Sequence, residues 1–153
     1  MSDLEQVRER FGELDLHDSR LNGIHLERRD GENVDRVRLD LELLEGSYPE
    51  YQWRPVQLAF CDCAFVKVEI DLLTKALCGG AISGSECLTA SSARDQIEAQ
   101  MLAIGRNPAG EYGEHPLADC LEFVLGLCPP GGELHVFAKE FALSNGLGSP
   151  CAA

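Results

Sequence analysis

The sequence predicts an α+β fold: a curved, mostly antiparallel sheet or partial barrel of five to six strands with two helices. Several short segments alternate apolar and polar residues, which is typical of strands with one solvated face. Only two segments place apolar residues at helical spacing. The elements follow one another as helix, hairpin, two strands, weak strand, helix and hairpin. This order lacks the strand–helix alternation of a doubly wound parallel sheet.

Short segments along the chain have strand character. In chain order they cover residues 21–29, 36–44, 56–63, 65–73, 81–88, 120–127 and 133–143. The most regular is "RVRLDLELL", in which apolar and charged residues alternate strictly, and "DGENVD" before it supplies turn residues. The chain must turn or bulge between Phe60 and Val66, and the segment at 81–88 is short and rich in Gly and Ser.

Two segments predict helices. Leu4, Val7 and Phe11 share one face of a helix over residues 3–12, which we expect to end near Gly12. The second helix is predicted at 93–104, where Ser92 and Asp95 have the spacing of a capping box.

The alternation also predicts which side chains form the core. We expect twelve residues to be largely buried: Val37, Leu39, Leu41, Leu58, Phe60, Val66, Val68, Ile70, Phe123, Leu125, Val136 and Phe141. With 153 residues, the chain has the length of one ordinary domain. We assign residues 1–145 to a single α+β domain and expect a loose C-terminal tail at 146–153.

The charge of the chain limits its partners. Asp and Glu number 26 against 13 Lys and Arg, a formal net charge of −13, and the excess is spread over both halves. Nucleic-acid binding needs clustered Lys and Arg, so we expect no nucleic-acid partner. A basic protein partner is electrostatically favourable, although the same charge also serves solubility.

Hydropathy indicates the compartment. No apolar run reaches the roughly 18–20 residues of a membrane span, and "MSDLEQVRERFGEL" has no apolar signal-peptide core. We therefore expect a cytoplasmic protein without membrane association.

A histidine–aspartate pair, His17–Asp18, is the first candidate for chemistry. Such a pair can hold a metal ion or transfer protons, but it lies between a predicted helix and a predicted strand. Asp-Ser is suitable turn chemistry there, and Asp18 can accept hydrogen bonds from nearby backbone N–H groups. We therefore interpret His17 and Asp18 as a structural turn, and keep an enzyme site as the alternative.

The chain has seven cysteines, and Cys61 and Cys63 lie on one strand face. Structural zinc sites usually combine two ligand pairs, and no second pair accompanies this one. In a reducing cytosol most buried cysteines act as small hydrophobic residues, so we predict core or turn cysteines and expect no metal and no cofactor. An unrecognised enzyme site that uses Cys61 and Cys63 stays open as an alternative.

Aromatic residues gather in one loop, "SYPEYQW". Tyr48, Tyr51 and Trp53 form a candidate binding surface, although local packing explains such residues equally well. No phosphate-binding glycine loop and no nucleophile elbow occurs in the sequence.

Three stretches together suggest a family. "LHDSRLNGIHLE", "VQLAFCDCAFVKVEI" and "LEFVLGLCPPGGELHVFAKEFAL", in this order, resemble small bacterial immunity-type proteins, notably the group called immunity protein 50, and uncharacterised relatives. The resemblance implies a cytoplasmic, non-enzymatic protein that binds and neutralises a toxin domain. It implies no catalytic residues.

Three functions are therefore weighed. The first is an acidic, non-catalytic protein-binding domain. The second is an enzyme with an unrecognised site near His17 and Asp18 or the cysteine pair. The third is a self-associating structural domain, for which a homodimer is the simplest form.

Overall fold

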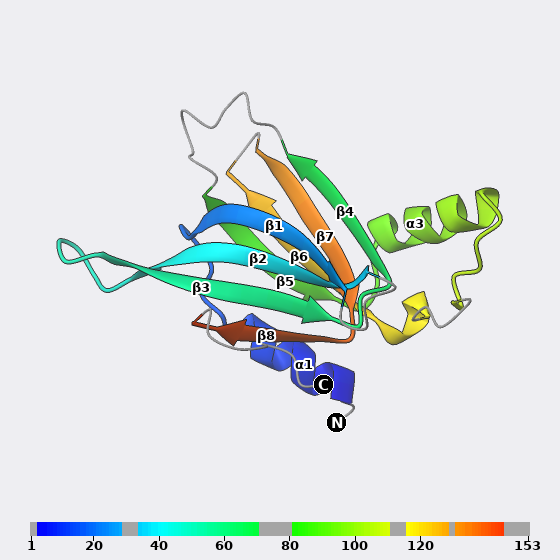
Figure 1. Cartoon of the computed structure of the whole chain (residues 1–153), viewed down its shortest axis with the longest axis horizontal. Coiled ribbons are helices and arrows are strands. Elements are labelled where there is room, and N and C mark those ends of the chain that lie inside the picture. The colour runs from blue at the N-terminus through cyan, green and yellow to red at the C-terminus, as the bar shows by residue number, and fades with distance from the viewer. Residues whose placement is uncertain (1–2, 29–33, 71–80, 111–115, 129–130, 146–153) are drawn as a thin grey trace.

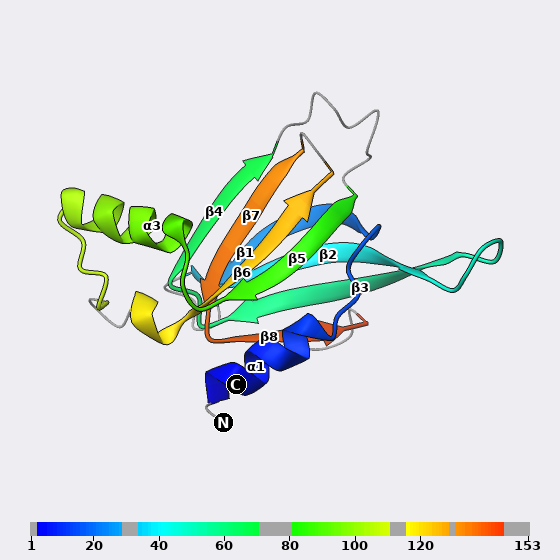
Figure 2. The same cartoon turned by 180° about the vertical axis from the view of Figure 1, so that it is seen from behind.

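The described part of the chain forms two four-stranded antiparallel sheets and two α-helices (Figures 1 and 2). The structure is a computed structural model, and it describes residues 3–28, 34–70, 81–110, 116–128 and 131–145. The predicted α+β class with antiparallel strands is confirmed. The described residues form eight strands in two sheets, where the sequence predicts five to six strands in one sheet or partial barrel.

Sheet A has the strand order β1-β2-β3-β8. Its strands are β1 (Arg20–Arg28), β2 (Val34–Glu45), β3 (Gln52–Cys61) and β8 (Glu140–Ser144). The pairing of Leu39 with Leu58 between β2 and β3 places the apolar set of both strands on one face, as the alternation predicts.

Sheet B has the strand order β4-β7-β6-β5. Its strands are β4 (Phe65–Ile70), β7 (Gly132–Ala138), β6 (Leu121–Leu127) and β5 (Ile82–Leu88). The weak segment at 81–88 is thus a real strand, because β6 supplies the cross-strand partners that its own sequence does not predict.

The chain passes twice between the two sheets at the same corner. One passage is the predicted turn between β3 and β4, where Asp62 has a φ of 56°. The other lies at Lys139, between β7 and β8, so "ELHVFAKEFAL" forms two strands where one is predicted. Lys139 N–H donates to the Cys61 carbonyl (3.2 Å) and Ala64 N–H donates to the Phe137 carbonyl (2.8 Å). These bonds join the two passages, and strands that change sheets in this way are typical of sheets that cross at a large angle.

Helix α1 (Asp3–Gly12) packs against β5 and β8, the edge strands on one side of the two sheets. Helix α3 (Ser92–Ala103) lies on the outer face of sheet B with a short 3-10 helix, η1 (Leu117–Asp119). Its N-cap is Ser91, whose hydroxyl accepts from Arg94 N–H (3.0 Å), and not the predicted Ser92. The described chain contains no helix that is both long enough and apolar enough to span a membrane.

Four phenylalanine rings join α1 to both sheets. The Phe11 ring of α1 lies 4.9 Å from Phe123 of β6, 5.2 Å from Phe141 of β8 and 6.3 Å from Phe60 of β3, between ring centroids. Phe60 and Phe123 also approach each other to 4.9 Å across the two sheets. These separations are in the favourable range for aromatic pairs, and all four rings are buried.

Nine of the twelve predicted core residues are buried, and the exceptions all lie on β4. Val66 and Ile70 are half-buried against the core, and Val68 is 46% exposed. The prediction for Val68 is therefore wrong. Val68 points to the inner face, opposite the buried Leu134, but sheet A does not extend over this edge of sheet B (Figure 1).

Three predicted features lie outside the described residues. They are the turn at 30–33, the end of the fourth strand at 71–73 and the tail at 146–153.

Replacing Leu41 by Ala tests the register of the central hairpin. Leu41 is 1% exposed, so Leu41→Ala should lower the free energy of unfolding by about 2–5 kcal/mol, as a deleted core leucine usually does. Chemical denaturation measures this. Leu26→Ala, on the neighbouring strand at a site 55% exposed, is the control and should change stability by less than about 0.5 kcal/mol. Equal losses in the two variants would contradict the register.

Candidate functional site

The connection between β2 and β3 projects beyond both sheets (Figure 1). The two strands stay paired up to Glu45 and Gln52, so only six residues form the turn. Gly46 has a φ of 90°, and a Cβ atom there would lie 2.6 Å from the Glu50 carbonyl oxygen. Glu50 N–H donates to the Ser47 carbonyl (2.7 Å). The turn is therefore tight and closed by its own backbone.

The three aromatic residues of the candidate binding surface are exposed at this end of the hairpin. Tyr48 is 83% exposed, Tyr51 51% and Trp53 40%. Local packing alone does not explain three exposed rings in one short segment, since a packing role would bury at least one of them. We call residues Glu45 to Trp53 the hairpin end.

Two arginines hold the base of the hairpin end. The Arg20 guanidinium lies 3.8 Å from the centroid of the Trp53 ring and 3.6 Å from the Glu42 carboxylate. Arg54 Nε donates to the Glu45 carboxylate at 2.6 Å. One face of Trp53 is thus covered by a cation, which fixes the ring orientation while 40% of the residue stays exposed.

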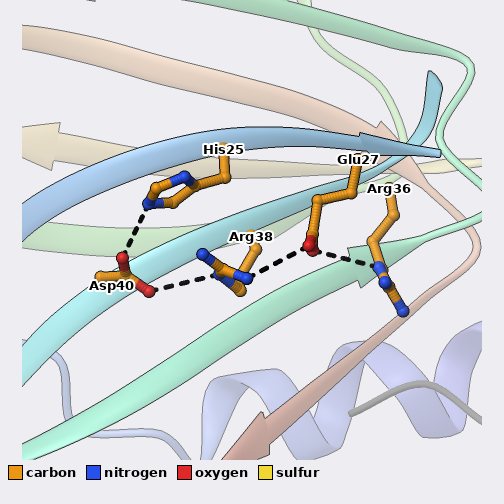
Figure 3. Close-up of polar contacts among 5 residues, drawn as sticks. All are labelled: His25, Glu27, Arg36, Arg38 and Asp40. Atoms are coloured by element: carbon orange, nitrogen blue, oxygen red, sulfur yellow. Dashed lines mark hydrogen bonds and ion pairs between the residues drawn. The ribbon is translucent and has the colours of Figure 1, made fainter. Parts of the chain in front are cut away.

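A row of alternating charges crosses β1 and β2 on the outer face of sheet A (Figure 3). His25 Nε2 lies 2.7 Å from Asp40 Oδ2, and Arg38 Nε lies 3.3 Å from Asp40 Oδ1. Arg38 also contacts Glu27 (3.1 Å), which contacts Arg36 (3.2 Å). Glu27 of β1 contacts two arginines of β2, and Asp40 of β2 contacts His25 of β1 as well as Arg38 of its own strand, so the row stabilises the register of β1 against β2.

The His25–Asp40 pair is the part of this row with catalytic character. A carboxylate that orients a histidine is half of a general-base arrangement. Gly23 leaves room for it, because a Cβ atom there would lie 3.1 Å from His25 Nε2. Among the described residues, no hydrogen bond joins the ring to a hydroxyl or thiol nucleophile, and Arg38 shares the Asp40 carboxylate. The geometry fits a structural pair better than a catalytic one.

His17 and Asp18 lie in a turn, where the sequence places them. The His17 ring is 3.2 Å from the Asp18 carboxylate, and both side chains are 64% exposed. Asp18 has a φ of 63°, and its N–H donates to the Ile82 carbonyl (2.9 Å). The carboxylate that accepts a backbone N–H is that of Asp15, which bonds His17 N–H at 3.3 Å. The local Asx-type contact therefore belongs to Asp15, and Asp18 contributes its left-handed backbone.

The two cysteines of the C-x-C pair differ, since one forms a disulfide and the other is a free thiol. Cys61 is buried and disulfide-bonded, a feature that the sequence analysis missed. Cys63 is free, as are Cys87, Cys120 and Cys128. Disulfides are rare in reducing compartments, so this bond gives no support to the cytoplasmic location, which stays a prediction. Among the described residues, no three His, Cys, Asp or Glu side chains form a group that could hold a metal ion.

Three of the free thiols, those of Cys63, Cys87 and Cys120, are poor nucleophiles. Burial raises the pKa of the Cys63 thiol to about 12 and the pKa values of Cys87 and Cys120 to about 11. The thiolate is the reactive form, so these thiols stay protonated and unreactive at neutral pH. An enzyme site based on Cys63 is correspondingly disfavoured.

A buried carboxylate on sheet B was not predicted from the sequence. Glu122 is fully buried on the outer face of β6, where its carboxylate accepts from the Ser91 hydroxyl and lies 2.8 Å from His135 Nδ1. His135 Nε2 lies 2.8 Å from Glu133. The His135 ring thus lies between two carboxylates, with one at hydrogen-bonding distance from each ring nitrogen. The sequence feature that could have indicated this site is the single acid within the apolar run "LEFVLGL". An acid in such a run is rarely buried without a partner, so it predicts a paired carboxylate.

Glu122 and its neighbours also anchor α3. Ser91 is the N-cap of this helix, and Arg94 in its first turn donates to the carbonyls of Leu117 (2.9 Å) and Cys120 (2.8 Å). The Ser91–Glu122–His135 chain thus connects the start of the helix to two strands of sheet B. This explains the buried charge as a structural device that positions the helix.

Comparison with known proteins brings no match: no family model, no curated protein and no solved structure corresponds to the chain.

Replacing Asp18 tests whether its carboxylate or its backbone matters. Asp18→Ala should lower stability by about 1–2 kcal/mol, because alanine adopts a positive φ poorly. Asp18→Gly should stay close to the wild type, since glycine adopts this conformation readily. Thermal unfolding of both variants measures the difference. An Asp18→Gly protein as unstable as Asp18→Ala would assign the role to the carboxylate and its contact with His17.

Replacing Glu122 tests the buried charge. Glu122→Ala leaves the Ser91 hydroxyl and the His135 ring without their buried acceptor, and should cost about 3–5 kcal/mol of unfolding free energy. Glu133→Ala removes the carboxylate on the other side of the same ring. Glu133 is 60% exposed at its side chain, so this control should cost no more than about 1 kcal/mol. Chemical denaturation compares them, and a reversed order would contradict the assignment.

Proposed function

We propose that the protein is a non-enzymatic protein-binding domain that uses the hairpin end to contact a basic partner. The exposure of Tyr48, Tyr51 and Trp53 together at the projecting hairpin end is the observation that carries this proposal. Tyrosine and tryptophan are the residues most enriched at energetically important positions of protein interfaces.

The construction of the turn supports this function. The backbone bond from Glu50 to Ser47 and the close approach at Gly46 restrict the turn before any partner arrives. The Arg20 guanidinium restricts the Trp53 ring in the same way. Groups that are already ordered lose less conformational entropy on binding, so exposed rings on this turn are well suited to recognition.

Charge selects the class of partner. The chain carries a net charge of −13, and the hairpin end itself contains Glu45 and Glu50, both exposed. A basic surface would be attracted over the whole molecule and guided to the aromatic turn. The resemblance to immunity-type proteins supplies the specific form of the proposal, in which the partner is a toxin domain that this chain neutralises.

The enzyme alternative has less support in the described residues. His17–Asp18 is exposed and has no third group, His25–Asp40 is shared with Arg38, and the Cys63 thiol is protonated. Each of these sites lacks an activated nucleophile held by a base.

Alanine variants of the hairpin end test the proposal. The immobilised chain is used to capture proteins from lysate of the cell that encodes it, and each captured protein is identified, purified and titrated. Tyr48→Ala, Tyr51→Ala and Trp53→Ala should each weaken binding, with at least one loss above about 2 kcal/mol, because interface aromatics contribute most of the binding energy. The affinity should also fall as salt is added.

The matched control uses exposed apolar residues elsewhere. Leu102 and Ile104, at the end of α3, are 63% and 74% exposed, so Leu102→Ala and Ile104→Ala remove similar surface from a different place. These variants should bind as the wild type does. If they weaken binding as much as the aromatic variants, or if the purified partner is acidic, the hairpin end is not the site proposed.

A further inference from the structure

Strand β4 is the outermost strand of sheet B, and among the described residues it is a regular edge with no strand on its outer side. Among the four edge strands of the described sheets, β5 and β8 pack beside α1. Strand β1 is interrupted by two register shifts against β2, and such bulges hinder pairing with a further strand. The register of β4 with β7 runs without a shift from Phe65–Phe137 to Ile70–Gly132. Open regular edges are templates for an additional strand.

The two faces of β4 carry different side chains. Val66, Val68 and Ile70 point to the inner face, and Val68 is 46% exposed there because sheet A does not extend over it. Lys67 and Glu69 point to the outer face and are both exposed. An apolar residue on the inner face of an edge strand indicates a surface that another strand covers.

We infer that a second copy of the chain pairs with β4 through its own β4, antiparallel and centred on Val68. A two-fold axis at Val68 places residue 67 of one copy opposite residue 69 of the other. Lys67 then faces Glu69 of the second copy, twice, by symmetry. On the other face Val66 lies opposite Ile70, and Val68 meets its own counterpart. Opposite charges and apolar pairs are both favourable cross-strand combinations.

The local charge supports a second copy as the occupant. The chain as a whole carries −13, so two copies repel one another over most of their surface. The segment Phe65–Ile70 contains one base and one acid and has no net charge. Electrostatic repulsion between two copies is therefore weakest at this strand, where Lys67 of each copy also faces Glu69 of the other.

The neighbouring strand adds a second reason. Glu69 lies opposite Glu133 of β7, and like charges directly opposite one another are destabilising. A lysine from a second copy on the free side of Glu69 would offset this repulsion. Lys67 lies beside His135, so it too gains from an acidic neighbour on its free side.

Self-association through β4 leaves the hairpin end free. The hairpin end and β4 lie on opposite sides of the molecule in both views (Figures 1 and 2). A dimer of this form presents two aromatic turns, so a partner with two binding sites would be held more tightly than by one copy. The two proposals can fail independently of each other.

Charge reversal along β4 tests the pairing. Sedimentation equilibrium of the full chain over a range of concentrations should show a monomer–dimer equilibrium. Lys67→Glu alone, or Glu69→Lys alone, places like charges opposite one another twice per dimer and should weaken dimerisation by about tenfold or more. The double variant Lys67→Glu with Glu69→Lys restores opposite charges with exchanged signs. It should therefore recover the wild-type dimerisation constant.

Two further variants complete the experiment. Arg8→Glu, on an exposed position of α1, changes the net charge as much as Lys67→Glu does and should leave dimerisation within about twofold. Val68→Glu places two carboxylates at the axis and should abolish the dimer, while the 46% exposure of Val68 keeps the fold intact. Circular dichroism checks the folding of each variant. A wild type that is monomeric at all concentrations, a dimer unaffected by Val68→Glu, or a folded double variant that fails to recover would each overturn the inference.

Discussion

The contact of Phe11 with three other phenylalanine rings is the interaction on which the rest of the structure depends. Among the described residues the chain passes between sheet A and sheet B at one corner, and packing between their inner faces holds the rest of the two sheets together. Phe11 contributes to this packing, since its ring touches Phe60 and Phe141 of sheet A and Phe123 of sheet B. Helix α1 is thereby held across the edges β5 and β8. This side of the molecule is closed by packing, and the burial of apolar area there stabilises the whole fold.

The opposite side has no such closure in the part of the chain that the structure describes. Strands change sheets at the Cys61 and Lys139 corner, and from there the two sheets cross (Figure 1). Crossed sheets overlap over their centres and leave edge strands uncovered, which is why β4 keeps Val68 exposed. The same geometry that buries Phe60 and Phe123 therefore leaves part of the inner face of β4 uncovered.

The polar clusters on the outer faces of the two sheets serve positioning more than chemistry. His25, Arg38 and Glu27 hold β1 against β2, and Glu122 with His135 holds the start of α3 on sheet B. Both histidines have carboxylate partners on neighbouring strands, and in both cases the acid also contacts another residue. Groups that are fully engaged with each other are poorly available to a substrate. Three exposed aromatic residues lie at the hairpin end, away from both of these polar clusters.

The sequence by itself determined the local elements, because periodicity and turn chemistry act over a few residues. The helix at 3–12, the hairpin around Leu41 and the turn at His17 and Asp18 all follow from spacing alone. The sequence also placed Tyr48, Tyr51 and Trp53 in one loop, but it did not decide between a binding surface and local packing.

Only the tertiary structure decided which strands share a sheet. The change of sheet at Lys139 interrupts a segment whose alternation continues on both sides, and alternation does not report which sheet a strand joins. The burial of Glu122 and the exposure of Val68 are consequences of that choice. Glu122 is covered because α3 begins above it, and Val68 is exposed because sheet A ends before reaching it. Both outcomes depend on contacts between residues far apart in the chain, which a local pattern does not contain.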